Sequence, residues 1–192
     1  MFDNPINGVL KNFSFLKIIG VFFIITGVIY NFIPRSSFVF FLLILKFLSI
    51  ICYMNWILFF LQNQKILNGW GWYLMYETVI LCLNIYLLLD NGESLVYFVG
   101  FMILLNASIL LIISIDFRLS SSSRELRIAI WSISGCFLSF VVIFPFILDF
   151  SAPNILVPLA FITTGIASMI LLEEFNKLNK HRINFRKLQR KF

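Results

Sequence analysis

Residues 94–115 read SLVYFVGFMILLNASILLIISI and contain no charged side chain. An α-helix needs about 20 predominantly apolar residues to cross the ~30 Å hydrocarbon core of a bilayer, and this stretch supplies them. Lipid offers no partner for unpaired backbone groups, so the stretch is predicted to be helical. The fold is therefore expected to be built from membrane-spanning helices.

Five further apolar stretches lie on either side of this one, at 16–33, 38–61, 70–89, 128–148 and 155–172. Pro, Gly, Asn and Asp end helices and form tight turns. They gather in the short connections at 34–37, 90–93 and 149–154. The sequence predicts an all-α, polytopic membrane protein with six transmembrane helices arranged as three repeated helical hairpins.

The composition agrees with a membrane protein. Of the 192 residues, 60% are hydrophobic, 12% are charged and 24 are Phe. A soluble domain of this length needs far more polar surface. No small-residue cleavage site follows the first apolar run, so we expect an uncleaved anchor. The predicted organisation is a cytoplasmic segment at 1–15, a six-helix transmembrane domain at 16–172 and a basic cytoplasmic tail at 173–192.

Positive charges predict the orientation. Most Lys and Arg residues lie in the terminal segments and in the connections 62–69 and 117–125, with Lys17 and Arg127 close beside them, whereas the hairpin tips carry Arg35 beside acidic residues. Cytoplasmic segments of membrane proteins are enriched in Lys and Arg. Both termini are therefore expected on the cytoplasmic side of the inner (plasma) membrane. The net charge of +6 therefore mainly reflects the positive charge of the predicted cytoplasmic segments. Nucleic acid is not an expected partner.

A repeat in spacing relates the predicted hairpins. Gly20, Gly27 and Pro34 stand seven residues apart, and the same spacing in the second hairpin selects Glu77 and Asn84. Seven residues bring two side chains to one helix face, where small residues allow close helix packing. The positions predicted to serve helix packing are Gly20, Gly27, Ser49, Asn106, Gly135 and Gly165.

These features resemble the HdeD-like acid-resistance membrane proteins. The resemblance rests on three hairpins, on the pattern from Gly20 to Pro34, and on Gly165-Ile166 in a descending helix; it covers roughly residues 14–178. It implies a bacterial inner-membrane protein linked to survival in acid, without an established chemical reaction. The chain departs from the pattern at Glu77 and Asn84, where glycine is favoured, and at Lys46, where an apolar residue is expected.

The two charged residues inside predicted spans are Lys46 and Glu77. Each costs about 3 kcal/mol near the bilayer centre on insertion scales, so such residues usually face the bundle interior and pair. Helix geometry places Glu77 level with Asn55 and Lys46 level with Asn84. We predict a polar seam between the second and third helices, formed by Lys46, Tyr53, Asn55, Glu77 and Asn84.

Three interpretations of the seam stay open. A clasp that fixes how the hairpins dock is favoured, and whether the amides also bridge Lys46 and Glu77 stays open at this point. The alternatives are an ion or proton site that acts as a protonation switch, and contact with lipid or with a partner subunit, which would make a homo-oligomer. Burial opposes the charge of a carboxylate whereas a nearby ammonium supports it. The switch hypothesis therefore predicts a change of pH response in Glu77→Gln.

The basic tail is a second candidate site. Apolar side chains recur there at helical spacing among many cationic ones, as in helices that lie on anionic lipid headgroups. The residues predicted to contact the lipid surface are Lys177, Lys180, Arg182, Arg186, Lys187, Arg190 and Lys191. The alternative interpretation is an ordinary positive-inside anchor.

Motifs for catalysis or metal binding are absent from the sequence. Cys52, Cys82 and Cys136 all lie in apolar stretches and are expected to be small fillers, and His181 is the only histidine. Neither a GxSxG nor an HExxH motif occurs, so no catalytic residue, metal or cofactor is predicted. We expect a non-enzymatic membrane protein that supports acid or envelope stress tolerance. The alternative is a small transporter or channel that uses the polar seam.

Overall fold

The structure, a computed structural model, describes residue 10 and the ranges 12–30, 32–33, 38–64, 69–89, 95–116, 122–144 and 153–189. Within these ranges the chain forms six α-helices and no strand, so the prediction of an all-α fold with six helices is confirmed. The helices are α1 (Phe15–Tyr30), α2 (Phe38–Gln62), α3 (Trp70–Leu89), α4 (Leu95–Asp116), α5 (Ser122–Ile143) and α6 (Pro153–Gln189).

Three helical stretches in the described ranges are long and apolar enough to cross a membrane. They are Leu43–Gln62, Leu126–Ile143 and Ile155–Lys180, and the shorter apolar stretches Phe15–Tyr30 and Val99–Ile115 accompany them. All six helices also present large apolar side chains on the outside, such as Ile18, Phe40 and Trp72. Water does not favour so continuous an apolar surface, whereas lipid does. These observations indicate a membrane protein; a sixfold crossing stays a prediction.

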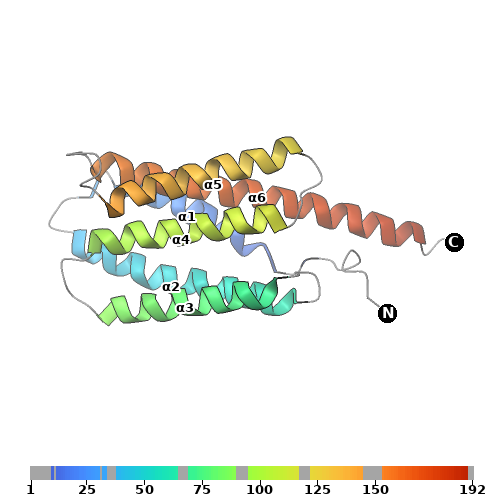
Figure 1. The fold of residues 1–192 in the computed structure, drawn as a ribbon, viewed down its shortest axis with the longest axis horizontal. Helices are drawn as coiled ribbons and strands as arrows, with labels where there is room; N and C mark the ends of the chain where they lie inside the picture. Colours follow the sequence, from blue (N-terminus) through green and yellow to red (C-terminus); the bar gives the residue numbers. More distant parts are fainter. Residues whose placement is uncertain are drawn as a thin grey trace.

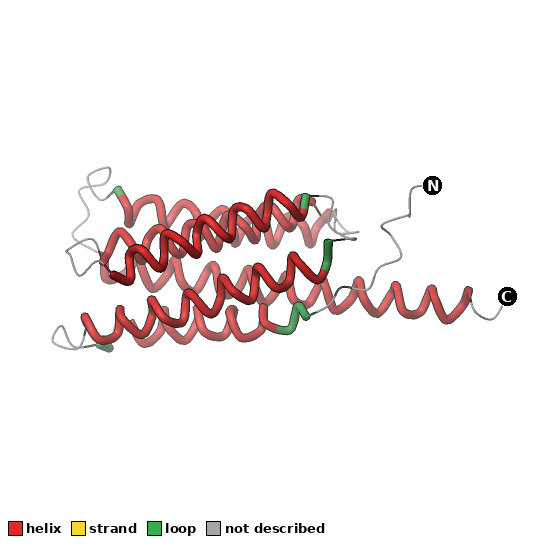
Figure 2. Tube along the Cα trace, turned by 90° about the horizontal axis from the view of Figure 1, so that it is seen from below, coloured by secondary structure: helices red, strands yellow, loops and turns green. Residues whose placement is uncertain are grey.

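The helices form two layers (Figures 1 and 2). The most extensive packing joins α1 to α6, α4 to α5 and α5 to α6, with further contacts between α4 and α6. We call α1, α4, α5 and α6 the four-helix core. Helices α2 and α3 pack on each other and form the second layer. Helix α1 packs mainly on α6, so α1 and α2 follow each other in the chain without being the main packing partners. The hairpin repeat stays a prediction.

Glycine permits the close crossing of α1 and α6. A Cβ atom on Gly165 would lie 2.8 Å from the carbonyl oxygen of Gly20 and 2.7 Å from a side-chain carbon of Ile24. One on Gly27 would lie 2.7 Å from the carbonyl oxygen of Pro158. The two distances to carbonyl oxygens are shorter than a carbon–oxygen contact allows, and those backbone atoms cannot move aside, so only glycine fits at Gly165 and Gly27. This is the close approach through which small residues favour helix association in lipid.

Glycine has the same role elsewhere in the four-helix core. A Cβ atom on Gly135 of α5 would lie 2.8 Å from Oγ1 of Thr164 in α6 and 3.2 Å from Cβ of Ala107 in α4. One on Gly100 of α4 would lie 2.8 Å from Ile143 of α5. By contrast, Gly71 of α3 has open space around it. The close glycine contacts of the described residues thus belong to the core and not to the α2–α3 layer.

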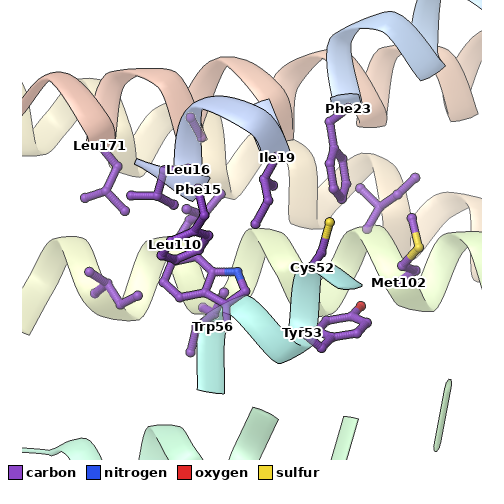
Figure 3. Close-up of a cluster of buried hydrophobic side chains, with 14 of the residues drawn as sticks. Phe15, Leu16, Ile19, Phe23, Cys52, Tyr53, Trp56, Met102, Leu110 and Leu171 are labelled. Atoms are coloured by element: carbon purple, nitrogen blue, oxygen red, sulfur yellow. The ribbon is translucent and has the colours of Figure 1, made fainter. Parts of the chain in front are cut away.

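Large aromatic side chains attach the α2–α3 layer to the core. Phe15 of α1 packs edge-on against Trp56 of α2, with ring centroids 5.0 Å apart. Phe59 of α2 stacks on Phe175 of α6 at 5.9 Å. Figure 3 shows the indole of Trp56 reaching from α2 toward Phe15 and Leu16 of α1, with Leu110 of α4 beside it. Large aromatic rings thus fill the space between the α2–α3 layer and the core, whereas glycine allows the core helices to pack closely against each other.

Helix α6 is much longer than the bundle. It runs without a break from Pro153 to Gln189, so the predicted boundary between the transmembrane domain and the tail at residue 173 does not interrupt it. Figures 1 and 2 show its second half projecting beyond the other helices. We call the end of the bundle from which α6 projects, and at which α1 begins, the terminal end. The start of the tail is therefore a helical continuation of α6.

Candidate functional site

Two contacts fix how α2 and α3 lie against each other. The ring of Phe60 stacks on that of Tyr73, with centroids 5.2 Å apart, near the terminal end. Eleven residues away on each helix, Oγ of Ser49 lies 2.9 Å from Oδ1 of Asn84. The two helices are antiparallel, so Glu77 lies level with Trp56. The register differs by one residue from the predicted level of Asn55.

Ser49 and Asn84 form the hydrogen-bonded part of the seam farther from the terminal end. Both side chains are buried, and Nδ2 of Asn84 also donates to the carbonyl of Ile80 at 3.0 Å. The Ser49 hydroxyl has a second acceptor in the carbonyl of Lys46 at 2.8 Å. Sequence reasoning assigned Ser49 to helix packing, and the structure adds a polar contact with the seam residue Asn84. Ser49 lies opposite Asn84 in the structure. The sequence had placed Lys46, three residues earlier in α2, at that height.

Tyr53 and Asn106 connect the seam to the four-helix core. Nδ2 of Asn106 in α4 lies 3.0 Å from the Tyr53 hydroxyl and 2.8 Å from the carbonyl of Met102. Tyr53 is 1% exposed and Asn106 is 3% exposed, so this hydrogen bond is shielded from water and lipid. Asn106 was predicted to serve helix packing. A lone amide in the middle of a charge-free helix was the available signal for a polar partner.

Glu77 is the most unusual residue of the seam. Its side chain is 0% exposed, and neither carboxylate oxygen has a hydrogen-bond partner among the described residues. Cys52 and Tyr53 of α2 and Tyr76 of α3 are described titratable side chains that lie near its carboxyl group. None of these supplies a positive charge. A buried carboxyl group without a donor is costly in its ionised form.

The question whether Lys46 and Glu77 are bridged is answered for the described residues by the surroundings of the Glu77 carboxylate. Lys46 is buried, with 6% of its surface exposed, but no amide or ammonium donates to the Glu77 carboxylate among the described residues. Asn55 also lies outside the seam: it is partly exposed, and its Nδ2 donates to the carbonyl of Ile51 in its own helix at 2.8 Å. A one-residue step along a helix turns a side chain by about 100°, so the difference of one residue between Asn55 and Trp56 is enough to turn the amide away from Glu77.

The residues predicted to serve helix packing are all buried. Gly20, Gly27 and Gly165 lie in the crossing of α1 and α6, and Gly135 lies between α4, α5 and α6. Ser49 and Asn106 make the hydrogen bonds described above. The set therefore divides into glycines that bring core helices together, Ser49, which joins α2 to α3, and Asn106, which joins α4 of the core to α2.

Only part of the tail is described in atomic detail. Lys177 interacts with both Glu173 and Glu174 of the same helix. Lys180 is exposed. Arg182, Arg186 and Lys187 lie on the helical continuation of α6, but their side chains are outside the described part, and Arg190 and Lys191 lie outside the described residues. The hairpin tips at 34–37 and 90–93 and residues 149–152 of the third tip also lie outside them.

Sequence reasoning missed a contact at the terminal end. The backbone N–H of Leu10 donates to Oδ1 of Asn179, and Nδ2 of Asn179 donates to the carbonyl of Leu10, both at 2.9 Å. An edge-on contact between Phe13 and Phe175 lies next to it, at 5.9 Å. These contacts join residues that are 169 positions apart, and an isolated Asn in a basic segment gives no signal for them.

Within the described ranges no group of three His, Cys, Asp or Glu residues could hold a metal ion. Cys52, Cys82 and Cys136 are free cysteines. Comparison of the chain with family models, curated proteins and solved structures finds no match. The similarity to HdeD-like proteins therefore stays a prediction from the residues, and the functional argument rests on the buried polar groups themselves.

Proposed function

We propose that this chain is a non-enzymatic, multi-pass protein of the inner membrane that supports tolerance of acid or envelope stress. In this proposal six helices cross the membrane as three hairpins, and both termini are cytoplasmic. The positive charges of the connecting segments support the orientation. The resemblance to HdeD-like proteins supports the link to acid.

The observation that carries the proposal is the environment of Glu77. Its carboxyl group is fully buried in the helical bundle and has no hydrogen-bond donor among the described residues. Binding a proton removes the charge that this environment leaves uncompensated. Intramembrane carboxyl groups of this kind are recurrent proton-binding elements of membrane proteins. Glu77 is thus the residue through which external or cytoplasmic acid would act on this protein.

Survival after acid challenge tests this proposal. A strain without the gene is complemented with wild type, with Glu77→Gln, or with Thr78→Val as a neighbouring control; Thr78 is exposed and bonds only to its own helix at Leu74. Membrane levels are matched by immunoblotting. We expect wild type and Thr78→Val to restore survival and Glu77→Gln to fail. Full rescue by Glu77→Gln, or no rescue by wild type, would contradict the proposal.

A second candidate function is a small transporter or channel for protons or monovalent cations. The observation that favours it is that three helices contribute polar groups to one buried region, with Asn84 of α3, Tyr53 of α2 and Asn106 of α4 in addition to Glu77. Proton flux into proteoliposomes separates the two candidates. Flux that Glu77→Gln abolishes would favour transport, whereas acid survival without measurable flux would favour the non-transport role.

Anionic lipid headgroups are the proposed partners of the tail. The support is that α6 continues as a helix into the basic segment, where each cationic residue near an anionic surface contributes about 1 kcal/mol. Full-length protein in nanodiscs with and without anionic lipid provides the test. Protection of residues 177–189 from proteolysis should increase with anionic lipid, and equal cleavage in both would contradict this partner.

A further inference from the structure

The surroundings of Glu77 differ in polarity toward the two ends of α2 and α3. Glu77 lies seven residues after Trp70, where α3 begins at the terminal end, and twelve residues before Leu89, where α3 ends. Its carboxyl group is buried and has no hydrogen-bond donor among the described residues. Any proton that it binds therefore arrives through the bundle, and the side chains toward each end determine from which side.

Aromatic rings close the side of Glu77 that faces the terminal end. Tyr73 lies one helical turn before Glu77 in α3, and its ring stacks on that of Phe60 in α2, with centroids 5.2 Å apart. The ring of Phe59 packs edge-on against Phe60 at 5.5 Å. We call Phe59, Phe60 and Tyr73 the aromatic layer; each of the three residues is at most 6% exposed. Closely packed apolar constrictions in membrane proteins exclude water.

Polar side chains lie on the other side of Glu77. Tyr53 lies near the Glu77 carboxyl group, and its hydroxyl interacts with the side chain of Asn84. Asn84 in turn accepts the hydrogen bond from Ser49 at 2.9 Å. We call Tyr53, Asn84 and Ser49 the polar file; all three residues are buried, and Asn84 lies two helical turns beyond Glu77. Groups of this kind offer hydrogen-bond partners to water inside a protein.

Glu77 is the group of this region that takes up a proton in acid. Helix α3 packs on α2 and α4. Cys52 and Tyr53 of α2 and Tyr76 of α3 lie near the carboxyl group, Lys46 is buried farther along α2, and the described side chains of α4 include no titratable one. Cys, Tyr and Lys side chains ordinarily carry their protons at neutral pH already. A fall in pH therefore acts on the carboxyl group.

We infer that Glu77 exchanges its proton with the side of the membrane opposite the terminal end, through water that enters along the polar file. A hydronium ion that arrives with this water transfers one proton to a carboxylate oxygen of Glu77, which becomes a neutral carboxyl group, and the hydronium leaves as water. The inference rests on the proposed role of Glu77 as a proton-binding residue. With the termini cytoplasmic, as proposed, the accessible side is external, so the protein responds to acid outside the cell although Glu77 is closer to the cytoplasmic end.

A pH step on one side of proteoliposomes that contain the full-length protein tests this inference. Two preparations are compared, one with the tail mainly outside and one with the tail mainly inside, as measured by protease cleavage of the tail. The outside is acidified, and protonation of Glu77 is followed by the infrared carboxyl band that Glu77→Gln lacks. We expect the band to rise at once when the tail faces inward, and only as the pH gradient decays when the tail faces outward. An immediate rise with the tail outward would overturn the inference.

A protonophore separates this inference from the proposed function. It equalises the pH on the two sides of the membrane, so Glu77 should become protonated in both preparations. A band that does not rise even then would overturn the proposed role of Glu77 and the inference with it. A band that responds to acid on the side of the tail overturns the inference alone.

Variants of the polar file test the route. Asn84→Leu and Ser49→Ala each remove a polar group from it and should slow the rise of the band roughly tenfold, the effect of about one lost hydrogen bond to the entering water. Tyr86→Phe is the matched control, because Tyr86 lies two residues after Asn84 and is 68% exposed. Rates are compared after scaling to the final amplitude with protonophore, so a loss of folded protein does not imitate a slower rise. Rates equal to that of Tyr86→Phe in both variants would overturn the inference.

Discussion

Asn179 pairs with both backbone groups of Leu10 and so connects the start of the described chain to the projecting half of α6. The two hydrogen bonds are 2.9 Å long, and both residues are buried. An amide side chain in this arrangement satisfies a donor and an acceptor that would otherwise be left without partners. The contact thus holds the segment before α1 against α6 at the terminal end.

Replacing Asn179 should destabilise the terminal end. Asn179→Leu leaves the buried N–H and carbonyl of Leu10 without partners, which costs about 1–3 kcal/mol for each unsatisfied group. We expect a lower midpoint of thermal unfolding in detergent and faster proteolysis before residue 15. Lys180→Ala, at the exposed neighbouring position, is the control and should behave like wild type. Identical unfolding of the two variants would show that the contact contributes nothing to stability.

The crossing of α1 and α6 should not tolerate a methyl group at Gly165. In Gly165→Ala the new Cβ meets backbone atoms of Gly20 and Ile24, which cannot move aside as a flexible side chain can. Overpacking of this kind costs about 1–3 kcal/mol. Gly71→Ala is the matched control because the space around Gly71 is open, and it should be neutral or slightly stabilising. Unfolding in urea or dodecyl sulfate measures both, and equal stabilities would contradict the close crossing.

The hydrogen bond between Tyr53 and Asn106 should appear as a coupling energy. A double-mutant cycle with Tyr53→Phe and Asn106→Ala isolates it, since each variant removes one partner. Interhelical hydrogen bonds in membrane proteins contribute about 0.6 kcal/mol on average and up to ~1.7. Tyr86→Phe, at an exposed position of α3, serves as control and should show no coupling to Asn106. Strictly additive effects of Tyr53→Phe and Asn106→Ala would mean that the bond is not formed.

Phe59 should be the most sensitive aromatic position of α2. It is fully buried and contacts the rings of Phe15, Trp56, Phe60 and Phe175, so it joins α2 to both α1 and α6. Phe59→Ala should destabilise the fold by about 3–5 kcal/mol, as expected for a buried Phe. Phe47→Ala on the same helix is the control because Phe47 is 52% exposed. If both variants unfold alike, the aromatic attachment of the α2–α3 layer is not the stabilising contact.

The sequence identified the helices but not all their ends. The predicted stretch 70–89 coincides with α3, because apolar length and helix length agree there. Helix α5 begins at Ser122, six residues before the predicted start, so it extends into a polar segment that apolar length does not mark. It ends at Ile143, close before Pro145, which disfavours a helical residue before it. Apolar length measures the membrane crossing, whereas caps and prolines determine where a helix stops.

The course of α6 shows the same limit. The predicted span ended at residue 172, but residues 173–189 contain no Gly or Pro and are rich in good helix formers such as Leu, Lys, Arg and Glu. Nothing in this segment ends the helix, so α6 continues to Gln189. A change from apolar to basic composition therefore marked the end of the apolar stretch and not the end of the secondary structure.

Helix pairing could be predicted only in part. The seven-residue spacing of Gly20 and Gly27 indicated a packing face on the first helix, and the structure buries that face. The spacing did not indicate that α6 covers this face, because small residues show that a helix can pack closely there but do not identify which helix it is. The direction of Asn55 and the environment of Glu77 also depend on rotations within the α2–α3 layer, which a single sequence does not define.

The pairing of α1 with α6 has a consequence for biosynthesis. Helix α1 is translated before α2 to α5 and its partner α6 after them, so the face that carries Gly20 and Gly27 stays uncovered while the intervening helices are made. At common rates of translation this interval is on the order of ten seconds. During it, insertion factors or a nascent second copy have access to the glycine face. A ribosome that stalls before α6 would release a chain whose first helix has no partner, and quality-control proteases of the membrane would meet it in that form.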